Sequence, residues 1–230
     1  MVEKARETVE SYDNLVPSIL GKEALNGEFH LEVVPIALTG LMPRTLTILK
    51  ENCPQLHLRI STGLTHQMLI ELERGNIEGA LITKPQALPP DIICQNIVTE
   101  EFEVLAAPAA ASDDPVELLS SNTFIRFNRQ AVAGQQIEAW LQTKGIRVAE
   151  TMELLGLGAV SSMVAANLGV PICPKSCVPS PLSTGLKRIS LGPDGPSRTL
   201  SLMRRSKSPK LHLIAQVQHA LQAAASGQEL

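Results

Sequence analysis

The chain has 230 residues, 44% of them hydrophobic, and a formal net charge of −3. This length allows one large domain or two smaller lobes with cores of their own. The acidic balance argues against direct binding of nucleic acid, which needs clustered Lys and Arg to displace counterions from the phosphates. The sequence shows no apolar run long enough to span a bilayer and no N-terminal signal segment, so we predict a soluble, cytoplasmic protein without membrane contact.

The first twenty residues have the pattern of an amphipathic helix. Apolar residues recur at alternating spacings of three and four from Val2 to Ile19, with charged residues on the other faces. Two interpretations remain open: a coiled-coil helix that pairs with another chain, or a helix that lies on its own domain. Pro17 kinks or ends this helix, and residues 21–27 form a turn-rich joint.

Strand and helix patterns alternate after that joint. In the first half, the patterns predict strands at 29–33, 56–60 and 79–82 and helices at 41–51 and 68–75. The same arrangement follows later, with strands at 124–127, 148–153 and 170–173 and helices at 132–143 and 160–168. This alternation predicts parallel strands joined by crossover helices.

Two further apolar strands, at 101–107 and 199–203, flank the second unit. They are natural connections between the halves. A last helix is predicted at 211–225, and the Pro-rich stretch 174–196 reads as a loop with one short strand around 186–191. The sequence therefore predicts an α/β fold of two Rossmann-like lobes joined by two crossover strands, rather than one long sheet.

A ligand site is expected beyond the carboxyl ends of the strands, where helix N-termini offer free backbone N–H groups. A cleft lined by hydroxyls, amide donors and few carboxylates suits a small anion or polar metabolite. The candidate ligand-binding residues at these ends are Ile36, Ala37, Thr39, Thr62, Gly63, Leu64, Thr65, Thr83, Asn128, Arg129, Gly156 and Gly158.

Each candidate also has a plain structural explanation. Thr62 and Thr65 could cap the following helix, and Arg129 could be an ordinary surface arginine. The sequence contains no Walker loop, HExxH, EF-hand or GxSxG motif, and no histidine has a partner at metal-ligand spacing. We therefore predict no metal, no cofactor and no catalytic residue. Cys173 and Cys177 could form a reversible thiol pair, although buried structural cysteines are the simpler interpretation.

An ordered series of short motifs resembles the effector-binding domain of LysR-type bacterial transcription regulators. It covers the chain from about Gly21 to the end. The motifs are residues 27–34, Leu41-Met42-Pro43, Cys53-Pro54-Gln55-Leu56, residues 74–80, residues 165–170 and Cys173-Pro174-Lys175-Ser176. The sequence departs from the family at Glu78, where Asp is usual, and at Ile36 and Ala37, where many members have Ser or Thr.

The resemblance implies a fold like that of type 2 periplasmic binding proteins, with an effector pocket between the lobes. It implies residues 21–98 and 205–230 as the first regulatory lobe, 99–204 as the second, and 1–20 as the tail of a linker or dimerisation helix. It also implies a homodimer or tetramer, and DNA contact only through an N-terminal winged helix-turn-helix that these 230 residues lack. The apolar residues at 36 and 37 count against a simple carboxylate effector. The effector is expected to be a small molecule, with an anion as one alternative, and stays unidentified.

Several functions remain in competition. The resemblance favours a metabolite-sensing regulatory domain. The alternative is a stand-alone solute-binding protein of the same fold. An enzyme is disfavoured because no nucleophile–base pair is visible, and a thiol switch would depend on Cys173 and Cys177.

Overall fold

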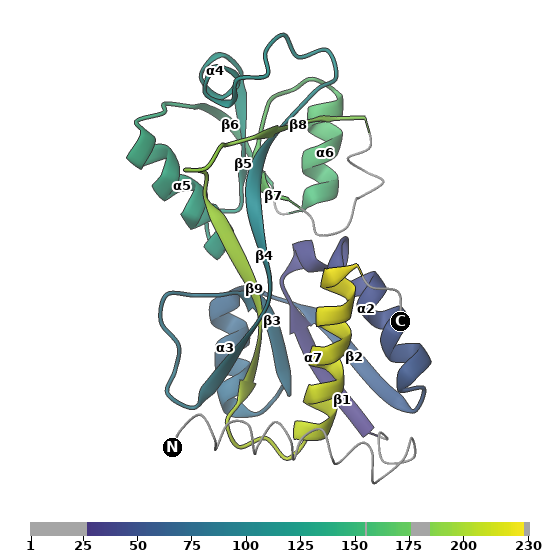
Figure 1. Cartoon of the computed structure of the whole chain (residues 1–230). Coiled ribbons are helices and arrows are strands. Elements are labelled where there is room, and N and C mark those ends of the chain that lie inside the picture. The colour runs from purple at the N-terminus through teal and green to yellow at the C-terminus, as the bar shows by residue number, and fades with distance from the viewer. Residues whose placement is uncertain (1–26, 155, 176–184, 228–230) are drawn as a thin grey trace.

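Two α/β lobes are joined by two long strands that run through both of them (Figure 1). The computed structural model describes residues 27–154, 156–175 and 185–227. The helix predicted over the first twenty residues, and Cys177, lie outside the described residues. Within the described residues, no helix has the length and apolar character needed to cross a bilayer.

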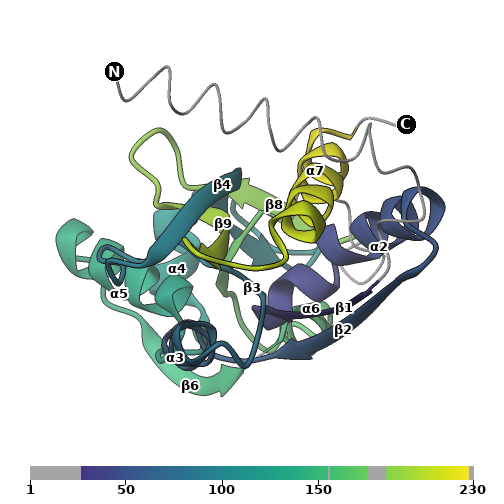
Figure 2. The ribbon, with the colours of Figure 1, turned by 90° about the horizontal axis from the view of Figure 1, so that it is seen from below.

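The first lobe contains a parallel sheet between two layers of helices. Its elements are β1 (Gly27–Val33), the 3-10 helix η2 (Pro35–Leu38), α2 (Leu41–Asn52), β2 (Leu56–Thr62), α3 (Thr65–Arg74), β3 (Gly79–Thr83) and α7 (Leu211–Ser226). β1 pairs in parallel with both β2 and β3, as the alternation of strands and helices predicts. Figure 2 shows α2 and α7 on one side of this sheet and α3 on the other.

Side-chain alternation explains these layers. Phe29, Leu31 and Val33 of β1 are fully buried in the cluster that includes α2 and α7. Ala80 and Ile82 of β3 belong instead to the cluster beneath α3. Because successive side chains of a strand point to opposite faces, β3 contributes to both cores.

The two crossover strands are β4 (Ile92–Ala106) and β9 (Ser197–Arg205), which pair antiparallel with each other. β9 also pairs with β3, which joins the crossover strands to the sheet of the first lobe. The β4–β9 register shifts between Asn96 and Val98, so the ladder contains an irregularity between its two ends. Both strands are longer than predicted, and they belong to both lobes.

The second lobe is built on the far end of β4. Its elements are α4 (Pro115–Ser121), β5 (Thr123–Phe127), α5 (Val132–Lys144), β6 (Ala149–Leu154), α6 (Leu157–Ala165), β7 (Ile172–Pro174) and β8 (Lys187–Ser190). β5 and β6 pair in parallel, whereas β7 and β8 pair antiparallel with β4. The predicted repeat of the first lobe is thus only partial, because β7 pairs with β4, and the segment before it meets β5 only at an isolated parallel bridge between Phe124 and Val170.

The carboxylate of Glu78 contacts two other segments of the first lobe. Glu78 Oε2 accepts a hydrogen bond from the backbone N of His30 at 2.6 Å, and its Oε1 lies 2.8 Å from Lys210 Nζ. Lys210 also donates to the carbonyl oxygen of Glu28. Burial of the Glu78 carboxyl raises its pKa, but Lys210 and the His30 N–H outweigh that effect and leave the pKa below its usual value.

We expect Glu78→Gln to lower the free energy of unfolding by about 2 kcal/mol near neutral pH, because a charge-assisted hydrogen bond is lost. The folded pKa lies below the unfolded value of about 4.3, so the contribution is complete above that value and disappears as pH falls through the folded pKa. Urea unfolding from about pH 7 to about pH 3 should show the difference vanish in acid. Glu71→Gln is the control, since its pair with Arg74 is exposed and contributes little. An equal deficit at every pH would contradict this account.

Candidate functional site

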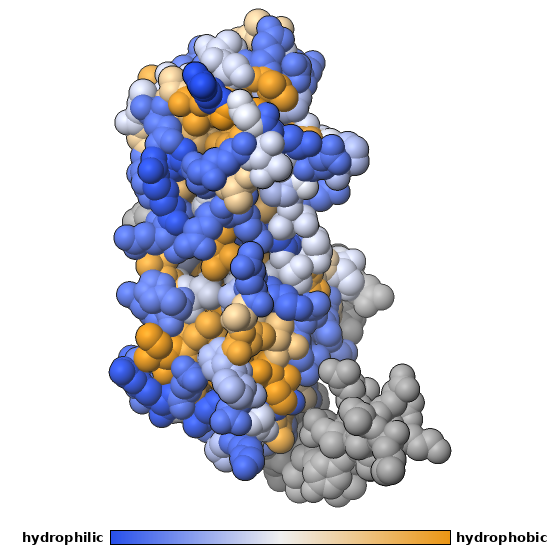
Figure 3. Space-filling model, turned by 90° about the vertical axis from the view of Figure 1, so that its left-hand side faces the viewer, coloured by the Kyte–Doolittle hydropathy of each residue, from blue (hydrophilic) through white to orange (hydrophobic). Residues whose placement is uncertain are grey.

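A cavity of about 590 Å³ lies between the two lobes. Such a volume is within the usual range for small-molecule sites. The face that carries α3 and α5 shows apolar surface among hydrophilic side chains in both lobes (Figure 3). The first lobe contributes residues 34–36, 62–65, Gln67 and Thr83 to the cavity; the second contributes residues 127–128, 130–133 and Glu153; and β9 contributes Arg198.

Seven of the twelve predicted site residues line this cavity. They are Ile36, Thr62, Gly63, Leu64, Thr65, Thr83 and Asn128. Each lies at or shortly after the carboxyl end of a parallel strand: six at the edge of the first-lobe sheet, and Asn128 after β5 of the second lobe. Ile36 also belongs to the buried apolar cluster of the second lobe, so η2 connects the two lobes at the cavity.

The other five predicted residues do not line the cavity. Ala37 is buried in the core beside α2, and the Thr39 hydroxyl donates to the carbonyl oxygen of Ile36 at 3.1 Å. Gly156 and Gly158 lie at the start of α6, which is on the opposite side of the second lobe from α5 (Figure 1). The fifth residue, Arg129, is held elsewhere by acidic side chains.

Glu150 and Glu153 of β6 hold Arg129. Arg129 forms ion pairs with both carboxylates, and its side chain is 57% exposed. Glu150 also pairs with the buried Arg126, and chiefly because of that hydrogen bond the pKa of Glu150 lies below its usual value. The acidic pattern of β6 therefore explains why the arginine next to Asn128 is not a cavity residue.

The loop between β5 and α5 forms the second-lobe wall of the cavity. Asn128 Oδ1 accepts a hydrogen bond from Gln130 N at 2.9 Å, and the Asn128 carbonyl oxygen accepts one from Ala131 N at 3.2 Å. Gly134 in the first turn of α5 allows this loop to pass close by, since a Cβ there would lie 2.0 Å from the Asn128 oxygen. The turn and the glycine together fix the entry into α5.

Two helices begin at the cavity, one from each lobe. The N-caps of α3 and α5 are Leu64 and Ala131, and neither makes a side-chain capping bond. The first-turn N–H groups thus remain available to a ligand. Each helix end stabilises a negative charge by about 0.3–1 kcal/mol, which is less than the several kcal/mol that burying one ion costs.

Buried hydroxyl groups are the clearest ligand-binding features of the cavity. The side chains of Thr83 and Thr65 are 3% and 8% exposed. Their hydroxyls make no hydrogen bond to any residue in the described part of the chain, and Thr65 is not the helix cap that the sequence also allowed. Neither hydroxyl oxygen is among the described polar atoms that are fully enclosed without a partner, so both remain open to the cavity and can bind a ligand atom.

The charged side chains of the cavity are few. Arg198 of β9 is 3% exposed and donates through Nε and Nη2 to Glu100 Oε2 of β4, at 2.7 and 2.5 Å. Glu153 accepts a hydrogen bond from Arg129 N at 2.8 Å. Sequence reasoning missed both residues, because one comes from a crossover strand and the other from a solvent-facing position of β6. Arg198 could be recognised from its opposite charge to Glu100, because the two residues occupy paired positions of the two crossover strands.

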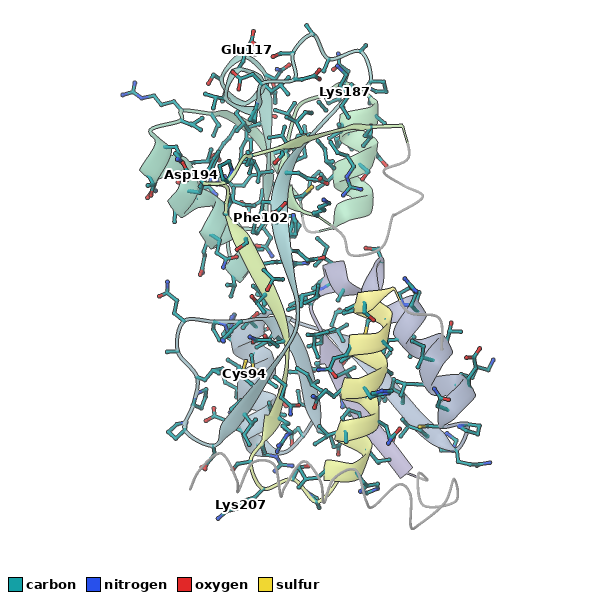
Figure 4. The ribbon with its side chains drawn as sticks, viewed as in Figure 1. Cys94, Phe102, Glu117, Lys187, Asp194 and Lys207 are labelled. Carbon is teal, nitrogen blue, oxygen red and sulfur yellow. The ribbon has the colours of Figure 1, made fainter. Side chains whose placement is uncertain are left out.

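None of the three described cysteines lines the cavity. Burial raises the pKa of Cys53, and burial followed by the nearby Glu103 raises the pKa of Cys173 to about 12. Cys94 is partly exposed on β4 in the first lobe (Figure 4). Thiols react as thiolates, so the buried Cys173 is poorly suited to the thiol exchange considered above.

Comparison with known proteins agrees with this architecture. A hydrogen peroxide-inducible genes activator of Haemophilus influenzae is 26% identical over 91% of this chain and 71% of its own length. The regulator CzcR of Bacillus subtilis is 22% identical, over 77% of this chain and 60% of its own length. The regulatory domain of reduced OxyR from Pseudomonas aeruginosa, 19% identical, superposes with a TM-score of 0.73 over 89% of this chain and 99% of that one. This likeness confirms the predicted two-lobed fold.

The match to a family model assigns the chain to a family. The model of the LysR substrate binding domain matches residues 22–226, which is most of the sequence. The match includes every residue of the interlobe cavity. The chain therefore belongs to the LysR substrate-binding domain family.

Proposed function

We propose that this chain is the effector-sensing part of a LysR-type transcription regulator, and that a small molecule binds in the interlobe cavity. The observation that carries the proposal is a cavity lined from both lobes, into which two largely buried threonines, Thr65 and Thr83, bring hydroxyls that bond to no described residue. In this proposal residues 21–98 and 205–230 form the first lobe and residues 99–204 the second. The family is one of regulators, which does not favour a stand-alone solute-binding protein or an enzyme.

The mechanism is a shift between arrangements of the two lobes. Because the cavity draws residues from both lobes, a ligand binds more tightly to the arrangement that brings its contacts together. A difference worth about 1–3 kcal/mol between the arrangements gives a useful response. The change passes through residues 1–20 to a DNA-binding domain outside this sequence, in a cytoplasmic homodimer or tetramer.

Peroxide sensing of the kind named for the Haemophilus relative is not part of this proposal. The loop from Asn128 to Ala131 contains no cysteine, and the described cysteines lie away from the cavity. Binding of a small molecule needs no reactive thiol.

A thermal-shift screen with small polar metabolites tests the proposal. A ligand at about 100 times its dissociation constant adds roughly 2.7 kcal/mol of stability. For a chain of this size we expect the melting temperature to rise by about 5–10 °C. Thr83→Val should abolish the shift, whereas Thr47→Val, at an exposed position of α2, should keep it. A screen without saturable shifts, or shifts that Thr83→Val leaves intact, would contradict the proposal.

A further inference from the structure

Each charged side chain of the interlobe cavity already has an opposite charge beside it. Arg198 is engaged by Glu100 through two hydrogen bonds to one carboxylate oxygen. Glu153 accepts from the backbone N of Arg129 and lies 3.5 Å from its Nε. The two pairs sum to zero formal charge, so the cavity offers no uncompensated cation to a ligand.

Apart from these two pairs, the polar groups of the cavity are uncharged. They include the hydroxyls of Thr62, Thr65 and Thr83, the carboxamides of Gln67, Asn128 and Gln130, and the first-turn N–H groups of α3 and α5. Around them the wall is apolar, with Ile36, Leu64 and Phe127 among its residues. An arrangement of apolar walls with a few convergent hydrogen-bonding groups orients a ligand without neutralising a charge on it.

We infer that the effector is an uncharged molecule with an apolar body and one or two carbonyl or hydroxyl oxygens, rather than a carboxylate. This inference rests on the function proposed above and specifies the chemical class of its ligand.

A carboxylate would meet two obstacles at this site. At the inner end it would have to compete with Glu100 for Arg198, both of which are nearly fully buried. At the second-lobe wall it would face the like charge of Glu153, which lines the cavity, whereas its partner Arg129 does not. Burying an ion without a new counter-charge is costly, and the two helix ends offset only part of that cost. A carbonyl or hydroxyl oxygen carries only a partial charge, so it accepts the same N–H and hydroxyl hydrogen bonds without this penalty.

Matched probe pairs test the inference on this chain. Each pair consists of a primary amide and a carboxylate on one carbon skeleton, such as benzamide with benzoate and hexanamide with hexanoate. Binding is followed by thermal shift and by the fluorescence of Trp140, the sole tryptophan, on α5. We expect the amide to bind saturably and the carboxylate about tenfold more weakly or worse.

Two variants test the cause of that preference. Glu100→Gln leaves the charge of Arg198 uncompensated, and should raise the affinity for the carboxylate about tenfold relative to the amide. Because this buried change could impair folding, Glu153→Gln provides a second test at a side chain that is 41% exposed, with an expected gain of about threefold. Glu117→Gln, on the distant helix α4 (Figure 4), is the matched control and should change neither affinity.

The outcomes distinguish a failure of the inferred ligand class from a failure of the proposed function. Carboxylates that bind more tightly than their amides, with binding lost in Thr83→Val, would overturn the uncharged class and leave the proposed function standing. If no member of any pair binds saturably, the proposed function fails and the inference fails with it.

Discussion

Replacing Arg198 with methionine should lower the free energy of unfolding by about 3–5 kcal/mol, because it removes the guanidinium that pairs with the buried carboxylate of Glu100. Glu100 is 6% exposed and Arg198 3%, so water cannot take the place of the missing guanidinium. Methionine keeps much of the side-chain length, which limits the contribution of an empty space. For a chain of this size the melting temperature should fall by about 6–20 °C.

A double replacement distinguishes the charge from the packing at this position. Arg198→Met combined with Glu100→Leu removes both charges and should recover much of the lost stability, since buried ion pairs are often no more stabilising than apolar pairs of similar size. The control is Lys144→Met, because the pair of Lys144 with Asp194 is exposed and should contribute less than about 1 kcal/mol. Chemical denaturation curves of the four proteins provide the measurement. Equal losses in Arg198→Met and Lys144→Met would show that burial does not set the strength of the crossover pair.

The location of this pair explains its importance. Glu100 and Arg198 are register partners on β4 and β9, the two strands that connect the lobes. The same arginine lines the cavity. A change that weakens the pair thus affects the connection between the lobes and the ligand site at once, and its effects on stability and on binding should be measured separately.

Part of the fold could be predicted because β1 alternates regularly and β3 is a short, continuously apolar run. Phe29, Leu31 and Val33 occupy one face of β1 and are fully buried, so the period of two is visible in the sequence. β4 was predicted too short, since residues 93–99 are partly or fully exposed and its ladder is irregular near Val98. The alternation of apolar residues is weakest where a strand crosses between two lobes.

Two helices show a second limit of prediction from the sequence. α4, from Pro115 to Ser121, was missed because seven residues carry too little apolar periodicity. A local signal was nevertheless present: the Asp114 side chain accepts a hydrogen bond from Val116 N at 3.1 Å and Pro115 follows it, a usual start for a helix. α6 begins at Leu157, three residues before the predicted start, with Gly156 as its N-cap. Gly156 and Gly158 disfavour a helix, so the sequence pattern did not predict the first turn of α6.

The candidate site was predictable where it follows the topology of the sheet. Thr62, Thr65, Thr83 and Asn128 lie at the carboxyl ends of parallel strands, and all four line the cavity. The direction of a side chain was less predictable, because it depends on charged residues that are distant in the sequence. Arg129 lies beside Asn128 in sequence, but it pairs with the carboxylates of β6 and does not line the cavity.

Gly134→Ala should reduce stability by about 2–3 kcal/mol and abolish effector binding, although alanine is normally preferred to glycine inside a helix by up to about 1 kcal/mol. The added Cβ would lie 2.0 Å from the Asn128 oxygen and 2.8 Å from its carbonyl carbon. These are backbone atoms, which cannot move aside as the end of a flexible side chain can. The loop from Asn128 to Ala131 must therefore shift, and the second-lobe wall of the cavity shifts with it.

Gly156→Ala is the matched control for this prediction. No atom lies within 4 Å of a Cβ at Gly156, and its φ of −136° suits any residue. This variant should unfold within about 0.5 kcal/mol of the parent chain and bind the same probes. Melting curves and probe titrations of both variants measure the difference. If Gly134→Ala melts like Gly156→Ala, the close approach at Asn128 is not needed for the fold. If it melts lower but binds probes unchanged, the β5–α5 loop is not part of the ligand site, and the first-lobe hydroxyls alone would have to hold the effector.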